Sequence, residues 1–319
     1  MSSEQFLKDL DIATQRLLKE EPRTHLGASQ IGDKCARAPW YVLRHVLDVP
    51  FDGRQLRLFD RGKDEEWRFY KWLEAMGVDV RPWVERLVYH AGSDSFACIP
   101  WDQDWTEDLD DVSLDPHMVA IATRMGQGPK QWGFFDHGGH YAGSCDGDVV
   151  GLGKWFPNIA SKGRGLIECK THNDKSFREL ASKGVQQAKP EHYIQMQQYM
   201  HYRELQWCLY MAVNKNDDDI YVEVVEYRAE VGAAYSDRAG SIIEARQAPP
   251  RITEDPSSFL CRFCDFKRIC HYGETPEKNC RSCQYASPGA DKTWVCGLHN
   301  QTIPATFIPK GCDKWEHVK

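Results

Sequence analysis

Residues 165–172 read GLIECKTH, an apolar stretch interrupted by one acid and one base. If this stretch is an extended strand, Glu168 and Lys170 project together from one face, while Ile167 and Cys169 project from the other. One face then belongs to a hydrophobic core, and the other carries a charge pair. A solvated ion pair on an edge strand contributes little, roughly 0–1 kcal/mol. A functional pair needs further polar groups at the same place, so the rest of the chain decides between the two interpretations.

Around this strand the sequence predicts a mixed α/β fold. YAGSCDGDVVGL (141–152) indicates a preceding strand, and the Gly-, Pro- and Lys-containing WFPNIASKGRG (155–165) indicates the connection. Further expected elements are helices over 1–22, 63–76, 190–205 and 230–247, strand-like pieces over 78–100, an acidic loop with a short helix over 101–131, and a hairpin over 207–227. Ser29 is a candidate cap before a helix that contains Trp40, and Gly77 is a candidate end for the helix over 63–76. The prediction is a restriction-endonuclease-like core, a central mixed sheet flanked by helices, over 1–275, followed by a small cysteine-rich, metal-binding tail over 276–319.

Composition and charge are those of a soluble globular protein. Of 319 residues, 41% are hydrophobic and 27% are charged, and no run of about 18 apolar residues interrupts them. The N-terminal stretch lacks a signal-peptide pattern, so a cytoplasmic protein without a membrane partner is expected. The net charge of −7 argues against indiscriminate binding to polyanions. However, seven acids lie within residues 101–117, whereas residues 161–215 carry nine Lys or Arg against five acids.

Three carboxylates and one lysine follow each other in an order that predicts metal-dependent hydrolysis. Asp146 lies in GSCDGD, in a strand that can neighbour Glu168, and Glu66 opens a helix upstream. Carboxylate oxygens bind divalent metals, the metal stabilises the negative charge that develops during phosphodiester hydrolysis, and a lysine orients or deprotonates the attacking water. Gln195 and Tyr199 are four residues apart and therefore share one helix face. Each of these residues alone is explained as well by a surface role, but together they predict a nuclease site.

The motifs G-x3-E, G-x-x-D-G, E-x-K and Q-x3-Y occur in this order, and the chain resembles the PD-(D/E)XK nuclease superfamily, in particular its RecB-type and lambda-type exonuclease branch. FDGRQLRLFDRG, ECKTHNDKSF and KPEHYIQMQQYM look similar to phage-encoded exonucleases used in recombination. The resemblance covers residues 28–275. It implies a Mg²⁺- or Mn²⁺-dependent deoxyribonuclease that hydrolyses DNA ends during recombination or repair, of phage or prophage origin and acting in the bacterial host cytoplasm.

The resemblance also implies roles for individual residues. The metal ligands would be Glu66, Asp146, Glu168 and the backbone carbonyl of Cys169. Lys170 would help to activate water, and Gln195 and Tyr199 would position the nucleophile or the DNA. The adjacent Glu65 is the alternative to Glu66, although the G-x3-E count favours Glu66, and Lys63 departs from the His common in relatives.

DNA, in the form of duplex ends, is the expected partner, and a locally basic surface would meet its phosphates. The candidate DNA contacts are Lys162, Arg164, Lys175, Arg178, Lys183 and Lys189. The resemblance further allows a single-strand annealing protein as a partner and a homo-oligomer, because lambda-type relatives can enclose DNA in rings. Two alternatives stay open: a structure-specific or CRISPR-adaptation-like endonuclease, and a catalytically inactive, metal-stapled DNA-binding module.

Twelve cysteines in a chain without a secretory signal indicate metal ligation rather than disulfides. Cys98, Cys145, Cys169 and Cys208 are scattered and are expected in the core. Cys261, Cys264 and Cys270 lie in FLCRFCDFKRICH, and Cys35 is the candidate for a fourth ligand. This arrangement is similar to that of iron–sulfur nucleases of the RecB-type branch, which implies a [4Fe–4S] cluster, with Zn²⁺ as the main rival.

A second cysteine set lies in the tail. Cys280, Cys283, Cys296 and Cys312 have the spacing of a zinc knuckle, with His299 as an alternate ligand. A tail of fewer than fifty residues buries too little apolar surface to fold unaided, so structural Zn²⁺ is expected there. A second iron–sulfur cluster stays open as an alternative.

Overall fold

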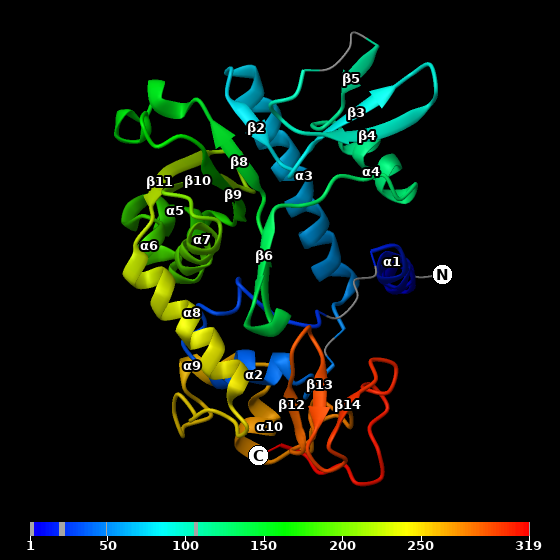
Figure 1. The fold of residues 1–319 in the computed structure, drawn as a ribbon. Helices are drawn as coiled ribbons and strands as arrows, with labels where there is room; N and C mark the ends of the chain where they lie inside the picture. The colour runs from blue at the N-terminus through cyan, green and yellow to red at the C-terminus, as the bar shows by residue number, and fades with distance from the viewer. Residues whose placement is uncertain (1–2, 19–22, 49, 105–107, 319) are drawn as a thin grey trace. The chain divides into compact units, whose positions relative to one another are not determined.

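The computed structural model describes residues 3–18, 23–48, 50–104 and 108–318. The chain forms two compact units, each built from segments that are far apart in the sequence (Figure 1). We call Arg57–Phe134 with Ser144–Arg228 the sheet unit, and Met1–Leu56 with Phe135–Gly143 and Ala229–Lys319 the cysteine unit. The cysteine-rich tail thus shares its unit with the N-terminal segment, and the boundary expected at residue 275 stays a prediction.

A five-stranded mixed sheet forms the centre of the sheet unit, with the strand order β11-β10-β9-β8-β2. β9 runs parallel to β10, with Glu168 opposite Tyr210 and Lys170 opposite Ala212. The other neighbours pair antiparallel. The strands are β2 (Asp79–Arg81), β8 (Gly147–Val150), β9 (Gly165–His172), β10 (Trp207–Asn214) and β11 (Ile220–Glu226). The expected mixed α/β class and the expected β10–β11 hairpin are confirmed.

The two faces of β9 differ as the alternation of its side chains predicts. Ile167 and Cys169 lie in a hydrophobic core of the sheet unit, together with Phe69 and Leu73 from α3 (Gly53–Ala75). Helices flank the sheet, and α5 and α7 contact both β9 and β10 (Figure 1). The helices that follow β9 are α5 (Asp174–Lys183), α6 (Val185–Ala188) and α7 (Pro190–Tyr202). Pro190 occupies the first turn of α7 as expected, because its fixed φ angle and missing N–H suit that position.

Helix α3 is longer than the sequence predicted, because FDGRQLRLFDRG is helical from Gly53 rather than a link. The side chain of Asp52 accepts a hydrogen bond from the Gln55 N–H at 2.6 Å, which satisfies a free donor in the first turn. Gly62 lies inside the helix, where a Cβ atom would meet nothing within 4 Å. Gly77 follows the helix with φ 79°, a conformation that favours glycine, so the predicted end is confirmed.

The strand expected over 141–152 is interrupted. β7 (Tyr141–Ser144) joins the three-stranded sheet β1-β7-β6, whereas β8 joins the five-stranded sheet. Asp146 lies between the two strands. The next residue, Gly147, has φ 151°, and a Cβ atom there would come within 2.9 Å of the Arg81 carbonyl oxygen. Glycine is therefore required directly after Asp146.

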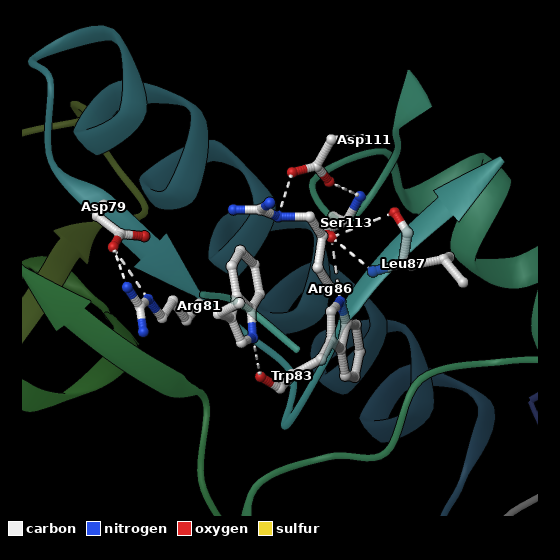
Figure 2. A network of polar contacts seen from close by, with 8 residues as sticks. Asp79, Arg81, Trp83, Arg86, Leu87, Asp111 and Ser113 are labelled. Carbon is white, nitrogen blue, oxygen red and sulfur yellow. Dashed lines mark hydrogen bonds and ion pairs between the residues drawn. The ribbon is translucent and has the colours of Figure 1, made fainter. Parts of the chain in front are cut away.

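A second sheet in the sheet unit, β4-β3-β5, contains part of the acidic stretch. The expected irregular loop is thus partly a strand, because Asp111 pairs with Arg86 at 3.0 Å and Ser113 Oγ accepts from the Leu87 N–H at 2.8 Å (Figure 2). Trp83 donates its indole N–H to the Ser113 carbonyl at 3.0 Å. The elements are β3 (Arg86–His90), β4 (Ser95–Ile99), β5 (Leu109–Asp111) and α4 (Pro116–Arg124). Glu107 of the acidic stretch lies outside the described residues.

The cysteine unit contains short helices and a small sheet, β12-β13-β14. The expected N-terminal helix is α1 (Ser3–Leu17), and the helix expected over 230–247 is α8 (Ala229–Glu244). Helix α2 (Arg37–Leu43) is preceded by Ala36, which makes no side-chain cap. Ser29 lies in a turn ahead of this helix, and its role as the cap of that turn stays a prediction. The remaining elements are β1 (Leu26–Gly27), β6 (Gly133–Asp136), α9 (Phe259–Arg262), α10 (Lys267–Tyr272), β12 (Ala286–Pro288), β13 (Trp294–Cys296) and β14 (Gln301–Ile303).

Among the described residues, no helix has both the length and the apolar character needed to cross a bilayer.

Two glycine substitutions test the packing of the sheet unit. Gly165→Ala would place a Cβ atom 2.3 Å from a ring carbon of the buried Trp207, so we expect a loss of about 1–3 kcal/mol of unfolding free energy. Gly62→Ala is the matched control, since its Cβ meets nothing, and we expect a gain of about 0.5–1 kcal/mol from the higher helix propensity of alanine. Urea unfolding measures both. Equal effects of the two changes would contradict this packing.

Candidate active site and cysteine centres

Glu168 and Lys170 form an ion pair on the polar face of β9. The Glu168 side chain is fully buried, whereas 24% of the Lys170 side chain is exposed. Burial and the nearby charge of Asp146 raise the pKa of Glu168 to about 7, although Lys170 opposes this shift. Burial alone would lower the pKa of Lys170, but the charges of Glu168 and Asp146 outweigh it and raise that pKa. In the metal-free chain the lysine is therefore a stable ammonium ion.

Asp146 is fixed beside this pair by two hydrogen bonds. Its Oδ2 atom accepts from the Cys169 N–H at 2.8 Å, and its carbonyl oxygen accepts from the Tyr70 hydroxyl at 2.6 Å. Tyr70 comes from α3, so the helix contributes directly to the position of the loop. Burial raises the pKa of the Asp146 carboxyl, while Lys170 and the Cys169 N–H lower it.

Helix α3 also brings Glu66 into the same electrostatic environment. Burial, then the charge of Asp146, raises the pKa of Glu66 to about 8, with a further contribution from Glu168. The adjacent Glu65 is buried as well, but its carboxylate pairs with Arg68 at 2.6 Å. Of the two neighbouring glutamates, Glu66 is thus the one that interacts with the other site carboxylates, in agreement with the G-x3-E spacing.

Helix α7 places Gln195 and Tyr199 on the buried side of the helix. The Gln195 Nε2 atom donates to the Tyr199 hydroxyl at 2.9 Å, and both side chains are at most 9% exposed. The alternative reading of this pair as surface residues is therefore excluded. Burial, followed by the charge of Glu168, raises the pKa of Tyr199, which keeps its hydroxyl protonated.

These residues fit a divalent cation. Burial raises the pKa of Glu66 and of Glu168, and the charge of Asp146 raises both further, because like charges are held together in a poorly hydrated place. Glu168 Oε2 is buried and has no hydrogen-bond partner among the described residues. Hard cations bind carboxylate oxygens, so one ion would both reduce the repulsion between the carboxylates and give the Glu168 Oε2 atom a partner. In the part of the chain that the structure describes, no three His, Cys, Asp or Glu side chains already surround a common metal position.

Two buried networks near this site were not predicted from the sequence. Arg203 donates to both oxygens of the fully buried Asp148 at 2.6 and 2.8 Å, and its guanidinium lies 4.2 Å from the Trp132 ring centre. These partners are far apart in sequence and match no spacing rule. In the sequence, the only indication of this network was Asp148, the second Asp of GSCDGD.

The other unpredicted network ties β9, β10 and α7 together. The Tyr210 hydroxyl contacts His172 Nε2 at 3.0 Å and His192 Nδ1 at 2.9 Å. Burial, with Lys189 and Lys170 nearby, lowers the pKa of His172 to about 4. Burial and Lys170 lower the pKa of His192 to about 3. Both imidazoles are therefore neutral beside Lys170 at physiological pH.

The candidate DNA contacts are spread over three places in the sheet unit, and most have acidic partners. Lys162 pairs with Glu226 at 2.8 Å, and Arg164 lies 3.7 Å from Asp148. On α5, the exposed Arg178 pairs with Asp174 and the exposed Lys183 pairs with Glu179. Lys175 is exposed on the same helix, and Lys189 directly precedes α7. Their role in DNA binding stays a prediction.

Cys35, Cys261, Cys264 and Cys270 line one cavity of about 70 Å³ in the cysteine unit. Arg37 donates to Cys270 Sγ at 3.7 Å. Burial and the charge of Cys35 raise the pKa of both Cys261 and Cys264. The four thiols predicted from sequence thus line one cavity, although no three of them surround a common metal position in the described part of the chain.

In the tail, the Cys283 N–H donates to the Cys280 carbonyl at 3.2 Å, so these two cysteines are neighbours. No three tail side chains in the described residues surround a common metal position. Burial, followed by the charges of Cys312, Cys283 and Cys296, raises the pKa of Cys280. The alternate ligand His299 is exposed in the turn between β13 and β14. Of the four scattered cysteines, Cys145, Cys169 and Cys208 are buried as expected, whereas Cys98 is half-buried.

No known family model matches the chain, and no curated protein matches it. Solved structures that resemble it include an alkaline exonuclease, LHK-Exo from Laribacter hongkongensis, at 16% identity and a TM-score of 0.35, covering 74% of this chain and 90% of that one. LHK-Exo in complex with dAMP gives 15% identity and a TM-score of 0.39 over the same shares. The protein SSO0001 gives 13% identity and a TM-score of 0.40, covering 83% of this chain and 96% of that one. At these TM-scores the likeness assigns the chain neither a family nor a function.

Removing one carboxylate should stabilise the metal-free protein at alkaline pH. The pKa of Glu66 is about 8 in the folded chain against 4.5 for a free side chain, so its stabilising contribution is complete below pH 4.5 and is lost as the pH rises through 8. With EDTA at pH 8.5, Glu66→Gln should therefore unfold with about 1–3 kcal/mol more free energy than wild type, and the gain should vanish near pH 4.5. Mg²⁺ should reverse the order by stabilising wild type alone. Glu74→Gln, on an exposed part of α3, is the control, and an equal gain there would refute the crowding of charges.

Proposed function

We propose that the chain is a divalent-metal-dependent deoxyribonuclease that hydrolyses phosphodiester bonds at DNA ends. The observation that carries this proposal is the state of Glu168. Its buried carboxylate bonds Lys170 through one oxygen, leaves the other oxygen without a partner among the described residues, and lies beside Asp146. A structural ion pair would not need a second buried acid or an unsatisfied oxygen, because both cost free energy.

The carboxylates of the site would hold the metal ion. Glu66, Asp146, Glu168 and the backbone carbonyl of Cys169 would hold Mg²⁺ or Mn²⁺. The bound ion supplies a Lewis acid for the scissile phosphate and lowers the pKa of a bound water. The Asp146 side chain already accepts from the Cys169 N–H, so this peptide group has a fixed orientation beside the carboxylates.

Lys170 acts as a cation rather than as a base. Its raised pKa keeps the ammonium charged, so it orients the attacking water and offsets the negative charge that develops on the phosphate. Gln195 and Tyr199, locked together by their hydrogen bond, present an amide and a neutral phenol for positioning water or DNA. The neutral His172 and His192 leave Lys170 without a competing positive charge from an imidazolium.

The preference for DNA ends rests on the sequence resemblance to RecB-type and lambda-type exonucleases. That resemblance also supports a phage or prophage origin, work in recombination or repair in the host cytoplasm, and a single-strand annealing protein as a partner. The bases of the sheet unit, exposed Lys175 among them, would contact phosphates with salt-dependent affinity.

The test is Mg²⁺-dependent degradation of linear duplex DNA, with closed circular DNA in parallel. Anaerobically purified protein should degrade the linear DNA alone. Lys170→Met should lower the rate by about a hundredfold or more, since it removes a charge aimed at the transition state. Lys8→Met, the same change at a lysine with a 63% exposed side chain on α1, should leave the rate unchanged.

The other outcomes separate the alternatives. Cleavage of circles by wild type but not by Lys170→Met would indicate an endonuclease that uses the same site. Intact DNA at every Mg²⁺ and Mn²⁺ concentration, together with retained DNA binding, would indicate the inactive binding module and would overturn the proposed activity.

We further propose that Cys35, Cys261, Cys264 and Cys270 hold a [4Fe–4S] cluster, with Zn²⁺ as the rival occupant. The cavity that all four thiols line supports a group with volume of its own, and the Arg37 guanidinium on Cys270 would stabilise a thiolate. Such a cluster would join the start of α2 to α9 and α10.

Anaerobic purification should give a brown protein with iron and inorganic sulfide in equal amounts. Cys264→Ala should lose the colour and the iron, whereas Cys98→Ala, a change at a half-buried cysteine outside the cavity, should keep both. A colourless anaerobic protein that contains zinc in an amount reduced by Cys264→Ala would decide for the rival.

A further inference from the structure

Two arginines of the cysteine unit are buried away from any acidic partner that the described part of the chain provides. Arg44, which caps the end of α2, is 1% exposed, and Arg281, between the first two tail cysteines, is 4% exposed. Both guanidinium groups lie over the ring of the fully buried Trp294, at 5.6 and 5.2 Å from its centre. Among the described residues, neither guanidinium pairs with a carboxylate.

Neutral acceptors hold these groups in place. Arg44 donates to the carbonyls of Arg281 at 3.1 Å, Ala286 at 3.2 Å and Ala245 at 3.2 Å. Arg281 contacts His45 Nε2 at 3.0 Å, while its Nε atom is buried and has no partner in the described chain. Carbonyls and an imidazole satisfy N–H groups but supply no negative charge.

Burying two like charges in one place is unfavourable unless an anion compensates them. A guanidinium group stays charged at neutral pH, so Arg44 and Arg281 are buried cations. Burial and the charge of Arg281 lower the pKa of His45, so this neighbour adds no compensating charge.

The thiols next to the arginines can supply the missing charge. Arg281 lies in Cys280-Arg281-Ser282-Cys283, and Cys296 is two residues from Trp294 on β13. Four thiolates around one Zn²⁺ ion carry two net negative charges, which equals the charge of the two arginines. Three thiolates with one neutral histidine would carry only one, and His299 is exposed.

We propose that Cys280, Cys283, Cys296 and Cys312 bind Zn²⁺ as four thiolates, and that Arg44 and Arg281 are the counter-charges of this centre. The proposal is independent of nuclease activity. The tail then has a structural function. Its negatively charged metal centre compensates the buried arginines, and the arginines compensate the charge of the metal centre.

Backbone contacts already join the same two segments. The Glu277 N–H donates to the Val46 carbonyl at 2.8 Å, and Asn279 Nδ2 donates to the His45 carbonyl at 2.8 Å. The Ser282 hydroxyl donates to the Glu277 carbonyl, which closes the loop that carries the first two thiols. The arginines are thus held at the metal-binding loop by the fold itself.

The ligand set is tested first on full-length protein by zinc content and by the spectrum after Co²⁺ replaces zinc. Cys312→Ser should lose one zinc per chain, while His299→Ala should keep it and retain the spectrum of a tetrathiolate site. Loss of zinc in His299→Ala, a spectrum with fewer than four thiolates, or wild-type protein whose zinc content is insensitive to Cys312→Ser would overturn the proposal.

The counter-charges are tested by competition with a zinc chelator. Arg44→Met and Arg281→Met should bind zinc about 10- to 100-fold more weakly, as is typical when groups that support metal ligands are removed. Arg246→Met, at an exposed arginine in the same unit, should match wild type. Arg44→Lys and Arg281→Lys keep the charge without the planar fork and should bind zinc more tightly than the Met variants.

Zinc affinity in the two Met variants equal to that of wild type would overturn the assignment of counter-charges. If a Met variant does not fold, Arg44→Gln and Arg281→Gln are compared with the Lys variants. Equal zinc affinity in Gln and Lys variants would then show that charge has no part in metal binding.

Discussion

Electrostatic repulsion constrains the sheet unit, because Glu66, Asp146 and Glu168 are held together beside one lysine. Three carboxylates in a poorly hydrated place repel each other, and burial together with the charge of Asp146 raises the pKa of both Glu66 and Glu168. A fold keeps such an arrangement only if the surrounding packing stabilises it. Binding of a cation then offsets the free-energy cost of the repulsion. The core between α3 and β9 provides this packing.

Each element around the site has a definable task. Helix α3 supplies both core residues and Glu66, and its Tyr70 hydroxyl fixes the Asp146 carbonyl. Gly147 permits the turn after Asp146, because any side chain there would collide with the Arg81 backbone. Successive side chains of β9 point to opposite faces, so Ile167 and Cys169 lie in the core and the charged pair lies on the other face. The site is therefore a property of the packed layers rather than of one loop.

The cysteine unit also holds like charges together in a buried place, but there the charges are positive. Here two buried cations, Arg44 and Arg281, lack acidic partners among the described residues, and Arg281 lies in the sequence between two thiols, Cys280 and Cys283, that can become anionic. Both units therefore contain charges that the polypeptide alone does not balance. In each case the chemistry of the neighbouring residues indicates the missing ion: carboxylates favour a hard divalent cation, and thiols favour zinc or an iron–sulfur cluster.

The sequence by itself determined what depends on local geometry. Alternation along GLIECKTH placed Glu168 and Lys170 on one face, helical spacing paired Gln195 with Tyr199, and Gly77 ended α3. Only the tertiary structure decided the pairs that join distant segments: Arg203 with Asp148, Tyr210 with two histidines, Arg44 with Arg281, and Glu66 rather than Glu65 beside Asp146. The reason is physical: backbone periodicity fixes which residues share a face within one element, whereas contacts across elements arise from how the layers pack, and no local spacing encodes that packing.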